Sequence, residues 1–81
     1  MIRLHVRLFG AEAAAAEATS VMVEFEAPPT ASAVLASVRA DERLASLSTH
    51  WRLAVNHAFV ADQHVCRPDD ELAIVGLVSG G

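Results

Sequence analysis

The ten residues LAIVGLVSGG, positions 72–81, are the stretch of this chain whose residue types could do chemistry. They carry no charged side chain, begin as an apolar strand and finish on Gly80 and Gly81, two of only four glycines in the sequence. Because glycine has no Cβ, both residues can lie extended in a narrow channel while another protein's backbone closes around them. The pattern predicts that Gly81 delivers its α-carboxylate as the reacting group. The alternative is an ordinary frayed or trimmed chain end.

The other candidates for chemistry are the single Cys66 and four histidines, His5, His50, His57 and His64. One residue separates His64 from Cys66, which is not a zinc-ligand spacing, and no second compact pair accompanies them. Cys66 has no base nearby in sequence, and free cysteine is often a buried core residue. We therefore expect no metal site and no cysteine nucleophile.

Length and composition limit the classes of protein that this chain can be. Its 81 residues, 53% of them hydrophobic, are enough for one small folded domain and too few for two. The net charge is −4 and the six basic residues are scattered arginines, which argues against nucleic acid as a partner. No apolar stretch resembles a signal peptide or a membrane span, and one cysteine cannot form an internal disulfide. We expect a cytoplasmic protein with no membrane partner.

The elements that must position the terminal residues begin with two alternating stretches. Residues 2–9 and 19–27 each alternate apolar with mainly polar side chains, which predicts two strands of a hairpin with one buried face. Residues 11–18, which connect them, are rich in alanine and fit either a loop or a short helical turn. The outward face of the first strand carries bases and that of the second carries glutamates, a favourable cross-strand pattern.

Two registers of this hairpin place bases opposite glutamates. The favoured one pairs Arg3 with Glu26 and His5 with Glu24, because it keeps the following proline out of the ladder. The other pairs Arg7 with Glu24 and His5 with Glu26. Both keep the same residues on the buried face.

The middle of the chain predicts a helix that covers the hairpin. Thr30 follows two prolines and is a good N-cap. We expect a helix over residues 31–40, and residues 41–50 permit a further helical turn because Leu44 and Leu47 are three apart. The apolar stripe of the main helix consists of Ala31, Val34, Leu35 and Val38.

The remaining elements are strands. A third strand over residues 51–56 leads through an Asn-His tight turn into a short strand over 58–61. After a turn at 68–70, the last strand covers 71–75 or slightly more. Because positions 72–75 are all apolar, we expect this strand at the centre of the sheet, beside the first strand.

This order of elements predicts an α+β fold, a β-grasp (ubiquitin-like) domain. The domain spans residues 1–77 and has a mixed sheet of four to five strands with one main helix packed on one face. We expect residues 78–81 to form a flexible tail. The expected core consists of Leu4, Val6, Leu8, Val23, Phe25, Val34, Leu35, Val38, Leu72 and Ile74.

Three apolar residues near the tail are candidates for partner docking. Phe9 lies on the outward side of its strand, Phe59 lies in a short edge strand, and Val75 lies on the side of its strand opposite to Ile74. Together they predict an exposed apolar patch; the alternative is ordinary packing beneath a loop. The tail residues that would enter a partner's channel with Gly81 are Val78, Ser79 and Gly80.

Four segments carry a resemblance to a known family. They are VRLFG (6–10), LAVNHAFV (53–60), PDDELAIV (68–75) and VSGG (78–81). In this order the chain resembles the small subunit of molybdopterin synthase, the MoaD family, among the MoaD/ThiS ubiquitin-like sulfur carriers.

The resemblance implies a function for the tail. A ubiquitin-activating-type enzyme would use ATP to adenylate Gly81, which would then become a thiocarboxylate. The large subunit, in a heterotetramer with this chain, would supply the catalytic side chains and use the sulfur to make the dithiolene of molybdopterin. The carrier itself would be non-catalytic alone and hold no permanent cofactor.

Three other functions stay open on the sequence. The chain could be a ThiS-like carrier for the thiazole of thiamine, since the same terminus serves that pathway. It could be a ubiquitin-like modifier whose Gly81 is joined to lysines of target proteins. It could also be a toxin-antitoxin or scaffold-type interaction module with an incidental tail.

Overall fold

The computed structural model of the chain describes residues 1–47 and 50–77. Its strands form one five-stranded sheet in the order β2-β1-β5-β3-β4, with β1 parallel to β5 and the other neighbours antiparallel. The elements are β1 (Ile2–Arg7), α1 (Gly10–Ala16), β2 (Ser20–Phe25), α2 (Ala31–Arg39), α3 (Glu42–Ala45), β3 (His50–Val55), β4 (Ala58–Phe59) and β5 (Leu72–Leu77).

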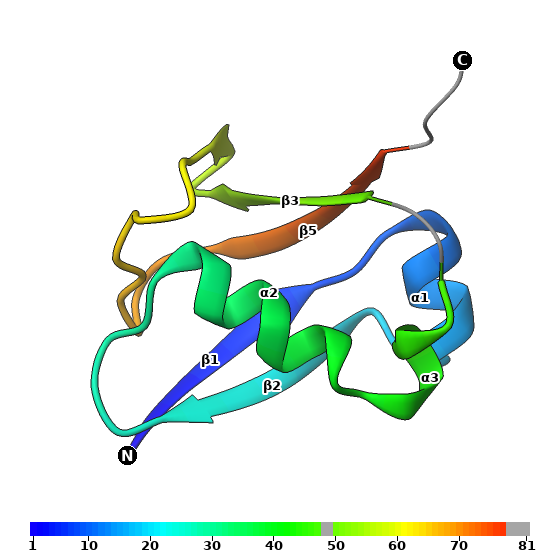
Figure 1. Cartoon of the computed structure of the whole chain (residues 1–81), viewed down its shortest axis with the longest axis horizontal. Coiled ribbons are helices and arrows are strands. Elements are labelled where there is room, and N and C mark those ends of the chain that lie inside the picture. The colour runs from blue at the N-terminus through cyan, green and yellow to red at the C-terminus, as the bar shows by residue number, and fades with distance from the viewer. Residues whose placement is uncertain (48–49, 78–81) are drawn as a thin grey trace.

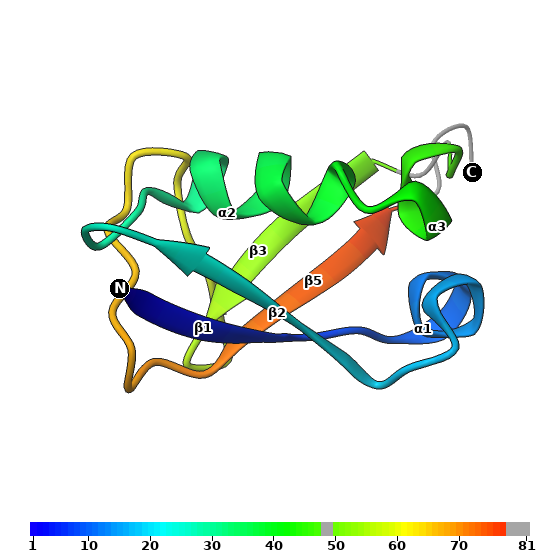
Figure 2. The same ribbon diagram turned by 90° about the horizontal axis from the view of Figure 1, so that it is seen from below.

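The layers are those of the predicted β-grasp. Helix α2 lies across one face of the sheet, and α1 and α3 sit together at the end where β5 finishes (Figure 1). The view from below shows the same arrangement, with α1 and α3 at the end opposite to the N-terminus (Figure 2). The last strand occupies the centre of the sheet beside β1, as its apolar sequence predicted.

The hairpin has the predicted inward residues but not the predicted register. Arg3 lies opposite Glu24, and His5 lies opposite Met22, two residues away from the favoured pairing. The connection explains the difference. The alanine-rich segment forms helix α1 between the two strands. The Leu8 amide donates to the Thr19 carbonyl at 2.9 Å beside this helix, and this pairing sets the register of the rest of the hairpin. The pairing still joins opposite charges, because Arg3 Nε lies 3.0 Å from Glu24 Oε2.

Helix α2 begins as its N-cap predicted. The Thr30 hydroxyl accepts a hydrogen bond from the Ala33 amide at 3.2 Å. Ala31, Val34 and Val38 are buried, whereas Leu35 is only partly buried and was wrongly placed in the core. It lies at the rim of a gap between the helix and the sheet, described below.

The helical turn that the leucine spacing permitted is present as α3. Asp41 caps it by accepting from the Arg43 amide at 2.9 Å, and Leu44 is fully buried. Phe25 in β2 is a second exception to the predicted core, because it is only partly buried. Further buried residues of the core are Ala16, Trp51, Leu53, Val55 and Cys66.

Strand β4 is shorter than predicted because the chain leaves the sheet after Phe59. The Val60 amide still donates to the Leu53 carbonyl at 3.2 Å. The segment then crosses to the start of α2, where the Ala31 amide donates to the His64 carbonyl at 2.8 Å. The Asn-His turn that precedes β4 is tight, with φ of 51° at Asn56 and 71° at His57.

Candidate functional site

The candidate site consists of the C-terminal residues and the strand that carries them. Gly81 and the predicted channel residues Val78, Ser79 and Gly80 lie outside the described residues. Their base, β5, pairs along its whole length with β3 and, at its first two residues Leu72 and Ala73, in parallel with β1.

Buried side chains fix β5 in place. Leu72 and Ile74 are 1% and 0% exposed, and Leu53 of β3 lies directly opposite Ile74. A strand that is paired along its whole length with a neighbour and buried on one face is among the last parts of a small domain to open. The described part of the site is therefore a rigid base for the residues that follow.

The start of β5 is tied to the turn between β3 and β4 by side-chain hydrogen bonds. Asp70 accepts from the Arg67 amide at 2.9 Å and from the Asn56 side-chain amide at 3.0 Å. The side-chain oxygen of Asn56, Oδ1, in turn accepts from the Glu71 backbone amide at 3.0 Å. The two bonds that Asp70 accepts, that from the Arg67 amide first and that from Asn56 second, lower its pKa because they favour the ionised carboxylate.

The far end of β5 meets a buried carboxylate. Glu12 of α1 is only 4% exposed, and its side chain packs against Gly76. A Cβ on residue 76 would lie 2.7 Å from Oε2 and 2.8 Å from Oε1 of Glu12, so a larger residue would have to displace that side chain. No sequence pattern pointed to this contact, because it joins two elements that are distant in the chain.

The predicted docking residues all lie on the sheet face opposite to α2. Phe9 and Phe59 are 52% and 51% exposed, and Val75 is partly buried. Phe9 and Val75 line one shallow pocket of about 240 Å³ together with Ala54 and other residues. Phe59 lies beyond it, where β4 pairs it with Ala54. Two of the three predicted docking residues, Phe9 and Val75, therefore line the same pocket. Phe59 does not line it but lies on the adjacent strand, β4, opposite Ala54.

Two arginines, Arg7 and Arg52, belong to the same surface, although neither was predicted to dock a partner. The Arg7 guanidinium lies 5.8 Å from the centre of the Phe9 ring, and that of Arg52 lies 4.6 Å from the centre of the Phe59 ring. Arg52 is also the cross-strand neighbour of Val75. The signal that could have found them is strand parity, since both alternate with buried residues and must point outward.

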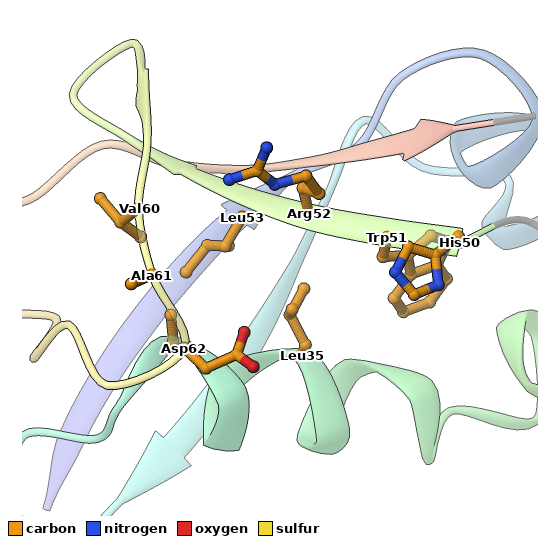
Figure 3. A pocket seen from close by; sticks show the side chains of 9 residues that line it. Leu35, His50, Trp51, Arg52, Leu53, Val60, Ala61 and Asp62 are labelled. Atoms are coloured by element: carbon orange, nitrogen blue, oxygen red, sulfur yellow. The ribbon is translucent and has the colours of Figure 1, made fainter.

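A second pocket, of about 290 Å³, lies on the helix side of the sheet, between α2, β3 and residues 60–62. Figure 3 shows Leu35 and Leu53 directed toward it, with Asp62 at its rim and the Arg52 side chain on the other side of β3. Arg39 flanks this region, with its guanidinium 3.5 Å from the centre of the Trp51 ring. This pocket is a gap between helix and sheet and is separate from the face that carries the predicted docking residues.

The remaining titratable groups do not assemble into a centre. Among residues 1–47 and 50–77, no three histidine, cysteine or acidic side chains are placed to hold a metal ion. Cys66 is buried, and its burial raises the pKa of the thiol, so it carries little thiolate. Within the same residues, no helix is long and apolar enough to cross a membrane.

Comparison with known proteins relates nearly the whole chain to one family. A sequence model of the ThiS family matches residues 6–81. Among solved structures, SAMP1 from Haloferax volcanii is 26% identical with a TM-score of 0.77, and the match covers 98% of this chain and 99% of that one. None of the curated protein sequences shows significant similarity.

Two more distant structures share the fold. A protein assigned as molybdopterin converting factor subunit 1 from Pyrococcus furiosus is 13% identical, with a TM-score of 0.77 over 96% of this chain and 100% of that one. Small archaeal modifier protein 1 from Methanosarcina acetivorans is 20% identical, with a TM-score of 0.67 over 100% of this chain and 98% of that one. At these identities the likeness establishes the β-grasp fold.

Proposed function

The chain belongs to the ThiS family, and from that premise we propose that it is a sulfur carrier that presents a thiocarboxylate on Gly81. The observation that carries the proposal is the family match, which runs through the terminal Gly-Gly pair to residue 81. The rigid base formed by β5 supports it, since a reacting terminus must be delivered from a fixed point. We assign the carrier to molybdopterin synthase, as its small subunit, on the resemblance of four sequence segments to the MoaD family.

The chemistry needs a partner because a carboxylate is a poor electrophile. An oxygen of the Gly81 carboxylate attacks the α-phosphorus of ATP and pyrophosphate leaves, which gives an acyl-adenylate. A sulfur nucleophile then attacks the acyl carbon and displaces AMP, so that sulfur replaces one carboxylate oxygen. A closed channel around the glycines protects the adenylate from water. The activating enzyme binds and uses the ATP, and the carrier contributes only its C-terminal carboxylate.

Two partners follow from this chemistry. A ubiquitin-activating-type enzyme loads the sulfur onto Gly81. The large synthase subunit, in a heterotetramer with this chain, then transfers that sulfur to form the dithiolene of molybdopterin. The exposed Phe9 and Phe59 and the partly buried Val75 lie on the sheet face opposite to α2 and are suited to docking such partners. Val78, Ser79 and Gly80 would occupy the channel.

A second candidate function is protein modification. Its support is the structural likeness to SAMP1 at 26% identity over nearly the whole chain, because the related structures name SAMP1 a small archaeal modifier protein. The same activated terminus serves both functions, and it also serves the thiazole pathway of thiamine. All six basic residues of this chain are arginine, so its own side chains offer no lysine amine that could attack the activated glycine.

The test is intact-mass spectrometry after incubation with the cognate activating enzyme, ATP and a sulfur source. We expect the wild-type chain to gain the mass difference of one oxygen replaced by sulfur, and the gain to require ATP. Deleting Gly81 withdraws the carboxylate by about 3.5 Å, whereas in-channel attack tolerates a misplacement of only about 1 Å. Loading should therefore fall by orders of magnitude.

The deletion also has a built-in control. Its melting temperature should equal that of the parent, because the residues of the core end at Ile74. Equal loading of both proteins would show that Gly81 is not the reacting residue. Adducts on lysines of other proteins, isolated from the native cell in place of the thiocarboxylate, would assign the chain to modification.

A further inference from the structure

The two edges of the sheet differ in length. Strand β4 forms one edge and consists of only Ala58 and Phe59. An edge this short offers few backbone groups to another strand. Strand β2 forms the other edge, and its six residues are all in register with β1. The sheet therefore has one short edge and one long edge.

The free backbone groups of β2 follow from its ladder with β1. The Leu8 amide donates to the Thr19 carbonyl at 2.9 Å, and these two residues continue the register of the hairpin. Bonded and non-bonded pairs alternate in an antiparallel ladder, so Val21, Val23 and Phe25 bond to β1. The residues whose amides and carbonyls point away from β1 are then Ser20, Met22 and Glu24. Within residues 1–47 and 50–77, no group bonds to these outward amides and carbonyls.

Several features that protect a long edge strand are absent from β2. It contains no proline and no lysine, and its register with β1 has no bulge. Its one acid, Glu24, is already paired with Arg3, whose Nε lies 3.0 Å from Oε2 of the glutamate. Met22, near the middle of the strand, is 50% exposed. The edge thus presents an apolar side chain among free backbone groups.

We propose that the β2 edge is an interaction surface for a second copy of this chain, and that the two β2 strands pair antiparallel about a two-fold axis at Met22. The outward backbone groups of Met22 then bond to those of Met22 in the second copy, and those of Ser20 bond to those of Glu24. On the buried face, Val21 comes opposite Val23. Both strands turn their buried residues to the same side, so both α2 helices lie on one face of the joined sheet.

Parity and charge select this register over its neighbours. A shift by one residue would set the buried side chains of one copy opposite the exposed side chains of the other. An axis at Val23 would bring the two Glu24 side chains onto a diagonal, and an axis at Glu24 would set them face to face. An axis at Val21 would leave the end of each strand unpaired. With the axis at Met22, each Glu24 faces a serine and no like charges are opposite.

The pairing goes beyond the proposed function and is compatible with it. Strand β1 separates β2 from β5, and the two copies run in opposite directions, so their β5 strands point to opposite ends of the joined sheet. Each terminus therefore stays available to its own partners. An interface made by one six-residue strand is smaller than that of a stable dimer, so the association is weak and depends on protein concentration.

The experiment is sedimentation equilibrium of the full chain at concentrations up to about 1 mM, a range that suits a small interface. Because residue 22 faces itself at the axis, Met22→Lys and Met22→Glu each set like charges opposite, whereas an equal mixture of the two sets opposite charges together. We expect each variant alone to dimerise about tenfold more weakly than wild type or worse, and the mixture to recover the wild-type affinity to within about threefold. High salt should reduce both effects.

The matched control is Val65→Lys, which adds the same charge at a residue that is 42% exposed and lies outside β2. It should dimerise like wild type, and thermal melting of every variant verifies that the fold is intact. A wild-type chain that stays monomeric overturns the inference, as does dimerisation that neither Met22 variant weakens. Failure of the mixture to recover affinity contradicts the axis at Met22. Association that continues beyond a dimer would assign the edge to aggregation.

Sulfur loading of the same preparations tests the proposed function separately. A dimer that is never loaded with sulfur supports the inference and contradicts the function. A chain that is loaded but stays monomeric supports the function and contradicts the inference. The two proposals can therefore fail independently of each other.

Discussion

The two faces of β5 differ in what covers them. Ile74 points toward α2 and is fully buried, whereas its neighbour Val75 points to the other face and is only partly buried. Helix α2 covers the first face, and none of the described helices covers the second (Figures 1 and 2). Successive side chains of a strand point to opposite faces of the sheet. One residue of β5 can therefore stabilise the core while the next is available to contact a partner. Substitutions at two consecutive residues, one on each face, can therefore test whether the two faces have different roles.

The largest expected effect is on the covered face. Ile74→Ala should lower the free energy of unfolding by about 2 to 5 kcal/mol, since it leaves a cavity in the core. Val75→Ala should cost less than about 1 kcal/mol. Urea unfolding of both variants measures the difference. Similar losses in the two would show that the outward face contributes to the core as well.

A smaller effect is expected at the end of β5, where α1 takes the place of α2. Gly76→Ala places a Cβ where the Glu12 carboxylate lies and should cost about 1 kcal/mol through displacement of that side chain. The same substitution in a Glu12→Ala background should cost much less, because the space is then free. A double-mutant cycle by urea unfolding measures the coupling. Equal costs in both backgrounds would mean that the two residues do not compete for space.

The aromatic residues of the outward face should affect stability less than binding. Phe9→Ala and Phe59→Ala each remove a half-exposed ring and a cation contact, for which we expect less than about 1 kcal/mol. Binding to the large synthase subunit should weaken about tenfold or more if the rings are docking anchors. Thermal melts and calorimetry separate the two effects. A large loss of stability with unchanged affinity would assign the rings to the core.

The smallest effect concerns a surface carboxylate on the helical side. A hydrogen bond from the Arg43 side chain, foremost, lowers the pKa of Asp41 from 3.8 to about 2. A lowered pKa in the folded state means that the ionised carboxylate stabilises the fold above pH 3.8 and that this contribution is lost as the pH falls through about 2. Asp41→Asn should therefore melt slightly below wild type at neutral pH, and the difference should shrink as the pH falls through about 2. A constant difference across that range would contradict the assignment.

The sequence predicted best what short-range chemistry determines. Alternation in β1 placed Leu4 and Val6 inward, and Thr30 marked the start of α2, because these signals depend on immediate neighbours. The hairpin register was wrong because it depends on whether residues 10–16 form a helix, and an alanine-rich stretch allows either outcome. Leu35 was misplaced because the gap beside it arises where the segment after β4 turns away from the sheet.

In the candidate site too, the sequence predicted the features that depend on neighbouring residues and missed those that depend on contacts between distant elements. Parity alone placed Phe9 and Val75 on the outward face, and the structure brings them into one pocket. The contact between Glu12 and Gly76 joins two elements and has no local signature. The stacking of Arg7 and Arg52 on aromatic rings depends on where each strand ends, which the sequence left open. The role of Gly81 stays a prediction.

The position of β5 determines when the chain can fold during its synthesis on the ribosome. It is the last strand in chain order and yet lies between β1 and β3. Until residues 72–77 have been made, both neighbours expose an open backbone edge and the core lacks Leu72 and Ile74. A nascent chain halted earlier cannot close the sheet and is left to aggregation and proteolysis. Translation must therefore reach the strand that adjoins the proposed reactive terminus before a folded domain can exist, so chains truncated before β5 are eliminated by their failure to fold.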